Sequence, residues 1–81
     1  MPEVIDAHTH IFPEKVVDRA VEQLTSIYGA TPVRRPVLDE LTAEMDEVGV
    51  DRSVYAPVST RPDQVPSINR FALNLIDHPR I

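Results

Sequence analysis

The chain contains no cysteine and no tryptophan, and only two of its 81 residues are glycine. Without cysteine no disulfide can form to stabilise the fold. A chain this short also buries a smaller fraction of its surface than a larger domain does, so its stability as a monomer is expected to be marginal. No stretch approaches the roughly 18 consecutive apolar residues of a membrane-spanning helix. The start also lacks the basic and then apolar segments of a secretory signal. The sequence therefore predicts a soluble, cytoplasmic chain with no membrane partner.

Basic residues are also scarce. Eight lysines and arginines stand against thirteen acidic residues, which gives a formal net charge of −5, and the largest basic cluster is the pair Arg34-Arg35. Nucleic-acid binding depends on neutralising a series of phosphates with lysine and arginine. The sequence therefore argues against a nucleic-acid partner.

What the chain does contain is a regular alternation of element types. Apolar residues recur at helical spacing in three segments, and two other segments are rich in β-branched residues. The expected strands are residues 4–10 and 52–59, and the expected helices are residues 13–28, 38–48 and 65–77. Strands joined by helical crossovers are parallel. This order predicts an α/β fold, the β-α-α-β-α opening segment of a (β/α)8 TIM barrel, which typically needs about 250 residues.

The most informative stretch is VIDAHTHIFP, near the start. Side chains alternate along a strand, so His8 and His10 share one face, about 6–7 Å apart along the backbone, with Asp6 one step deeper. Two imidazoles so placed can bind one cation, and the carboxyl ends of barrel strands carry active sites. Asp6 is a candidate carboxylate that orients a histidine or a neighbouring group without binding the metal itself. The alternative is a pair of partly exposed histidines at a strand end. The opposite face, expected under the helices, holds Ile5, Ala7, Thr9 and Ile11.

The same stretch carries a resemblance to a known family. VIDAHTHIFPE resembles the first strand of the amidohydrolase superfamily, and most closely its amidohydrolase-2 branch of decarboxylase-like metal-dependent hydrolases. The stretches LTAEMDEVGVDRSVYAPVST and NRFALNLIDHPRI resemble the segments that follow there, so the resemblance covers essentially the whole chain. It implies that His8 and His10 are ligands of a divalent metal, most often zinc. The metal would serve water activation and hydrolysis, or non-oxidative decarboxylation, of a small-molecule substrate.

Other residues are weaker candidates. Arg61, expected after the second strand, and Phe12, which follows the histidines, are candidates for substrate contact, although a solvated arginine is the simpler interpretation of Arg61. The pair Arg34-Arg35 is expected in a loop, as a surface pair or folded over the site. His78 is expected at the opposite end of the strands, away from His8 and His10.

Two convincing metal ligands fall short of the three that catalytic zinc sites usually have. We therefore expect 1–81 to be a single segment, the N-terminal third of a metal-dependent hydrolase barrel, with no complete catalytic site and no activity alone. Two alternatives remain open. One is a non-catalytic metal-binding or structural module that forms homo-oligomers through its open strand edges. The other is an interaction domain in which the histidines are incidental.

Overall fold

The computed structural model describes residues 2–81, which form a small α/β fold. Two parallel strands are hydrogen-bonded neighbours in one sheet, and three α-helices accompany them. In chain order the elements are β1 (Ile5–Thr9), α1 (Val17–Tyr28), α2 (Leu38–Val48), β2 (Arg52–Tyr55), a short 3-10 helix (Pro62–Gln64) and α3 (Val65–Leu73). The predicted α/β class, element order and parallel strands are confirmed.

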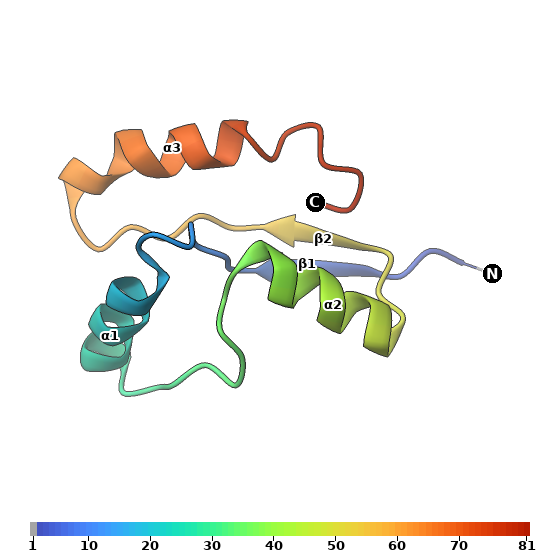
Figure 1. The fold of residues 1–81 in the computed structure, drawn as a ribbon, viewed down its shortest axis with the longest axis horizontal. Coiled ribbons are helices and arrows are strands. Elements are labelled where there is room, and N and C mark those ends of the chain that lie inside the picture. Colours follow the sequence, from blue (N-terminus) through green and yellow to red (C-terminus); the bar gives the residue numbers. More distant parts are fainter. Residues whose placement is uncertain (1) are drawn as a thin grey trace.

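The helices take different positions around the sheet. Helices α2 and α3 run alongside the strands, whereas α1 lies beyond their carboxyl ends (Figure 1). Both α1 and α2 end at a glycine with positive φ, Gly29 at 69° and Gly49 at 81°. Glycine adopts this left-handed conformation without the steric penalty of a Cβ atom, and it is the common residue after a helix. The predicted ends at these glycines are confirmed, and so are both bounds of α2.

Five element ends differ from the sequence prediction, each by one to four residues. Helix α1 begins at Val17 rather than at residue 13, because Val16 has φ −123° and ψ −4°, outside the helical range. Strand β1 covers 5–9 rather than 4–10. Strand β2 ends at Tyr55 rather than at residue 59, since its partner strand β1 ends at Thr9, which pairs with Tyr55. Helix α3 ends at Leu73 rather than at residue 77. The turns that follow α3 are bonded at three-residue spacing and lead to Pro79, which disfavours helix in the residue before it.

The ladder between β1 and β2 contains one irregularity. Asp6 pairs with Ser53 and Thr9 pairs with Tyr55, so three steps along β1 match two steps along β2. Paired residues of neighbouring strands lie on the same side of the sheet, and a shift of one residue moves the following side chains to the other face. Asp6 and Thr9 therefore lie on one side, although strict alternation would separate them.

This irregularity corrects the predicted faces of the first strand. Thr9 and Ile11 are buried, 8% and 2% exposed, as expected for the face under the helices. Ile5 is 54% exposed, because it precedes the irregularity and lies on the other side. His8 and His10 flank Thr9 and are exposed, so they share the uncovered side with Ile5. The predicted apolar face is thus divided between the two sides of the sheet.

The buried core is small. Its apolar members are Ile11, Val17, Val37, Met45 and Leu75. Many other large apolar side chains stay at least two-fifths exposed, including Ile5, Val54 and the fully exposed Val33. Two strands and three helices leave much apolar surface uncovered, as expected of a chain this short.

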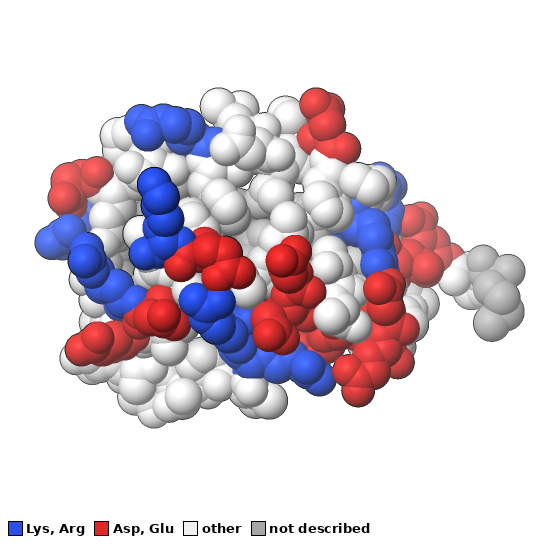
Figure 2. Space-filling view, viewed as in Figure 1, with Lys and Arg blue, Asp and Glu red and all other residues white. Residues whose placement is uncertain are grey.

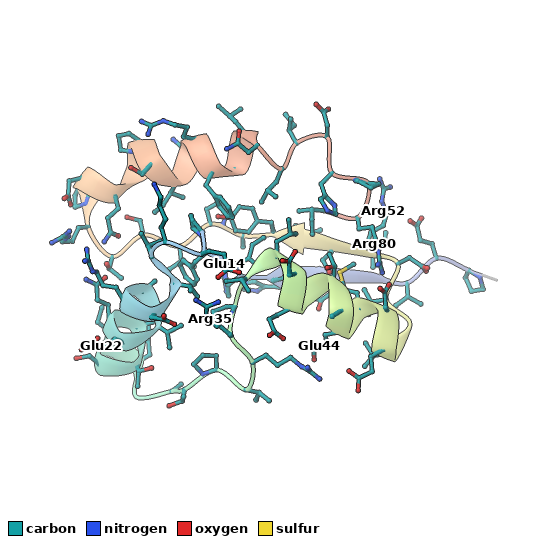
Figure 3. All side chains as sticks on the ribbon, in the orientation of Figure 1. Glu14, Glu22, Arg35, Glu44, Arg52 and Arg80 are labelled. Atoms are coloured by element: carbon teal, nitrogen blue, oxygen red, sulfur yellow. The ribbon has the colours of Figure 1, made fainter. Side chains whose placement is uncertain are left out.

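Residues after α3 return to the outer edge of β2. The backbone N–H of Ser53 donates to the carbonyl oxygen of Arg80 at 2.8 Å, on the edge of β2 away from β1. The guanidinium of Arg80 donates to the carbonyl oxygens of Val50 and Asp51 and pairs with the carboxylate of Asp46. Arg80 therefore lies beside the start of β2 (Figure 3).

Charged side chains of both signs alternate over the face that carries α1 and α2 (Figure 2). In this region Arg34 pairs with Glu44 and Glu47 of α2, at 3.2 and 3.3 Å. Arg35 pairs with Glu14 and with Asp18 of α1. The two arginines thus tie the loop before α2 to both neighbouring helices. No helix within residues 2–81 is long and apolar enough to cross a membrane.

Candidate metal centre

The two candidate metal ligands lie at the carboxyl end of β1. His8 belongs to the strand and His10 follows its last residue, Thr9. Two bonds fix this end against β2: the hydroxyl of Thr9 donates to the carbonyl of Val54, and the N–H of Ala56 donates to the carbonyl of Thr9, both at 2.8 Å. The backbone that carries the histidines is therefore anchored between them.

The two imidazole rings lie together. Their centroids are 4.7 Å apart and the rings are nearly perpendicular, with an interplanar angle of 75°. The Nδ1 atom of His10 is 2.8 Å from the carbonyl oxygen of Ala56. A carbonyl oxygen only accepts, so Nδ1 carries the hydrogen and the lone pair of a neutral ring is on Nε2. Metal-binding histidines are commonly oriented in this way by a carbonyl on the second ring nitrogen.

The spacing of the rings fits one bound ion. Zinc binds imidazole nitrogen at about 2 Å in tetrahedral geometry, which places the centroids of two ligating rings about 5 Å apart. The observed 4.7 Å is close to that value. Both side chains are exposed, so an ion reaches them without displacing the core. The pair therefore suits a borderline-soft cation such as zinc, which imidazole ligands favour.

Asp6 takes a different position from the one predicted for it. Its carboxylate accepts a hydrogen bond from the backbone N–H of His8 at 3.1 Å. The ladder irregularity places Asp6 on the side of Ser53, rather than on the side of the histidines. Asp6 thus holds the backbone at His8, while the ring of His10 is oriented by Ala56. No sequence signal identifies this backbone carbonyl.

The described part of the chain supplies only this pair. Within residues 2–81 no three His, Asp or Glu side chains gather as a metal-binding group. His78 lies near the start of β2, where its Nδ1 accepts from the N–H of Arg80 at 3.1 Å. Arg80 is bonded in turn to Ser53, so His78 belongs to the end of the sheet opposite His8 and His10. The predicted separation of His78 from the pair is confirmed.

Two hollows meet at Phe12, beside the histidines. One, of about 400 Å³, is lined by His10, Phe12, Val58 and apolar residues of α1 and the following loop. The other, of about 340 Å³, lies between α1 and α3 and is lined by Phe12, Arg61 and the aromatic pair Tyr55 and Phe71. Phe12 is therefore placed to contact a molecule in either hollow. Arg61 borders only the second one and pairs there with Asp63 at 3.3 Å.

Two side chains have shifted pKa values, Tyr55, which lines the second hollow, and Arg35. Burial raises the pKa of the Tyr55 phenol above its usual value, because the ionised form is disfavoured away from water. The ring of Tyr55 meets that of Phe71 edge to face, with centroids 6.0 Å apart. Hydrogen bonds to Glu14 and then to Asp18 raise the pKa of the Arg35 guanidinium (Figure 3). Arg35 is thus paired with Asp18 of α1 and with Glu14, which precedes that helix.

Comparison with known proteins adds no relative. The chain matches no protein-family model, no curated protein and no solved structure.

Proposed function

We propose that this chain binds a divalent metal ion, zinc in the first instance, through His8 and His10. The supporting observation is the pair of exposed rings 4.7 Å apart, with the Nδ1 of His10 bonded to the carbonyl of Ala56. That bond sets the ring tautomer and leaves Nε2 available as a ligand atom. The anchored strand end reduces the entropy lost when both rings bind one ion, because the backbone between them is already ordered.

The proposal extends to the kind of protein in which such a pair works. The Asp-x-His-x-His stretch resembles the amidohydrolase-2 branch, and two parallel strands with a helical crossover are compatible with part of a (β/α) barrel. The contact between Arg80 and the outer edge of β2 agrees with strand order in such a barrel. We therefore infer a metal-dependent hydrolase or decarboxylase type of site, in which this chain contributes the ligands of the first strand.

The chemistry follows from the ligand set. A bound zinc ion lowers the pKa of a coordinated water and polarises a substrate oxygen. The chain's own part is to hold two neutral imidazoles at the carboxyl end of β1 and to fix the tautomer of His10. The apolar hollow beside His10 would take an uncharged part of a small substrate, with Phe12 as its wall. A complete catalytic site needs at least one ligand more than this pair.

Zinc binding can be measured directly on the purified chain by isothermal titration calorimetry. We expect binding to be lost in the His8→Ala/His10→Ala variant and kept in His78→Ala, which removes the third histidine at the other end of the sheet. Circular dichroism of each variant checks that the fold is retained. Equal binding by the double variant and the parent, or no binding by the parent, would contradict the proposal.

A further inference from the structure

We propose that the hollow between α1 and α3 is a second binding site, which takes a small organic anion with a flat apolar body. Arg19 would hold the anionic group, and the rings of Phe12, Tyr55 and Phe71 would contact the apolar body. The volume of about 340 Å³ lies within the usual range for small-molecule sites. This inference goes beyond the proposed function, because the site needs no metal ion.

The hollow is separate from the candidate metal centre. Neither His8 nor His10 lines it, although it shares a wall with the hollow beside His10. Tyr55 pairs with the buried Thr9 across the ladder, so the Tyr55 ring lies on the side of the sheet that the helices cover. The two histidines are exposed on the other side. A molecule in the hollow would therefore leave the imidazole nitrogens free to bind a metal ion.

The interior of the hollow is apolar and largely aromatic. Its main apolar members are Phe12, Leu24, Tyr55, Ile68 and Phe71. All five are half-buried, so a bound molecule would remove apolar surface that is still in contact with water. Tyr55 and Phe71 already meet edge to face, and aromatic rings favour this packing or offset stacking with a further ring. The lining therefore suits a flat apolar body.

The charged residues of the lining favour an anion. Arg61 is paired with Asp63 at 3.3 Å, whereas Arg19 pairs with no carboxylate within residues 2–81. Two arginines against one aspartate leave one positive charge in excess, on a chain whose formal net charge is −5. A guanidinium presents several N–H donors in a planar fork that matches the oxygens of an anionic group. Arg19 is thus the group that such a ligand would engage.

Gln64 adds neutral hydrogen-bond donors to the same lining. The backbone N–H of Thr60 donates to Oε1 of Gln64 at 2.9 Å. A backbone N–H only donates, so this contact identifies which end of the side-chain amide is the oxygen. Within the described part of the chain the NH2 group of Gln64 has no hydrogen-bond partner. Gln64 and Arg19 therefore both offer N–H groups that an anion can accept from.

The site can be tested by titrating the isotope-labelled chain, free of metal, with naphthalenesulfonate and with naphthyl phosphate, followed by NMR. The two probes carry the same rings and distinguish between the anionic groups. We expect at least one of them to shift the amide resonances of Thr60 and Ser67, which line the hollow, and to leave that of His8 unchanged. Naphthalenesulfonamide, a neutral analogue, should bind severalfold more weakly. Zinc should not displace the anion.

Two arginine variants separate the site from a general effect of charge. Arg19→Gln should raise the Kd of the anion about tenfold, as expected for the loss of one charge-assisted hydrogen bond. Arg70→Gln is the matched control, because Arg70 belongs to α3, lies outside the lining and pairs with no carboxylate within residues 2–81. It removes the same charge and should leave the Kd unchanged. Circular dichroism of both variants checks that the fold is retained.

The outcomes are distinct from those for the proposed function. Unchanged anion binding by the His8→Ala/His10→Ala variant would support two separate sites, whether or not the parent binds zinc. Equal binding of the neutral analogue, equal weakening by the two arginine variants, or displacement of the anion by zinc would overturn the inference. The absence of binding by both anions would overturn it as well.

Discussion

Replacing Met45 by alanine is expected to destabilise the chain by about 3 kcal/mol. Met45 lies in α2, is 2% exposed, and its sulfur accepts a hydrogen bond from the hydroxyl of Ser53 in β2 at 3.3 Å. Truncation of a buried methionine to alanine costs about 2–5 kcal/mol, from lost burial and from the cavity left behind. Ser53 is itself 3% exposed and would lose its side-chain acceptor, so a value in the middle of that range or above is expected.

This loss is large against the whole stability of the chain. At about 0.05–0.15 kcal/mol per residue, a chain of 81 residues has a free energy of unfolding of about 4–12 kcal/mol. Urea unfolding followed by circular dichroism should therefore show a midpoint lowered by about 1 M or more, with the slope unchanged. The circular dichroism signal without urea, compared with that of the parent, reports whether the variant is still fully folded.

Val48→Ala is the matched control, because Val48 lies in the same helix but is 64% exposed. Its effect should stay within about 0.5 kcal/mol, and alanine is also the better helix former. If the Met45 and Val48 variants unfold at the same urea concentration, α2 does not pack on β2 through Met45. The placement of the covered sheet face, and with it the assignment of His8 and His10 to the other side, would then be refuted.

Two further predictions follow from other contacts. The raised pKa of Tyr55 favours its neutral form in the folded chain, so its contribution to stability is complete below the usual value of about 10 and is lost as pH rises through the folded-state pKa. Thermal unfolding of Tyr55→Phe should consequently depend less on pH in the alkaline range than that of the parent, and identical alkaline profiles would contradict the burial. Arg80→Ala removes the side-chain bonds to Val50, Asp51 and Asp46 that hold its carbonyl at Ser53. Amide hydrogen exchange at Ser53 should then be faster, while exchange at Ala56, bonded to Thr9, stays as in the parent.

Local patterns in the sequence were sufficient for much of the framework. The spacing of Leu38, Leu41 and Met45 and the following Gly49 predicted α2 with both of its bounds, since a helix and its stop depend on neighbouring residues. His8 and His10 are two positions apart on a β-branched strand, and this spacing predicted that their side chains lie on the same face. The structure brings their rings to 4.7 Å, although with a ladder that differs from strict alternation.

Sequence periodicity predicted the end of β1 less well, because a register irregularity depends on both strands. Strict alternation placed Asp6 beside the histidines and Ile5 under the helices. The pairing of Asp6 with Ser53 and of Thr9 with Tyr55 reverses both placements. The sequence of β1 alone contains no glycine or proline that would have indicated the irregularity.

The sequence by itself thus determined the α/β class, the order of elements, the helix-ending glycines and the positions of the two histidines, because each of these depends on residues close together in the chain. Only the tertiary structure decided which side of the sheet the histidines occupy, which carbonyl orients His10 and which strand edge Arg80 reaches. These features join residues that are 27 to 47 positions apart or depend on a backbone atom that every residue type carries. The physical reason is that hydrogen bonding between strands is satisfied by backbone geometry, on which the identity of a single side chain has little influence.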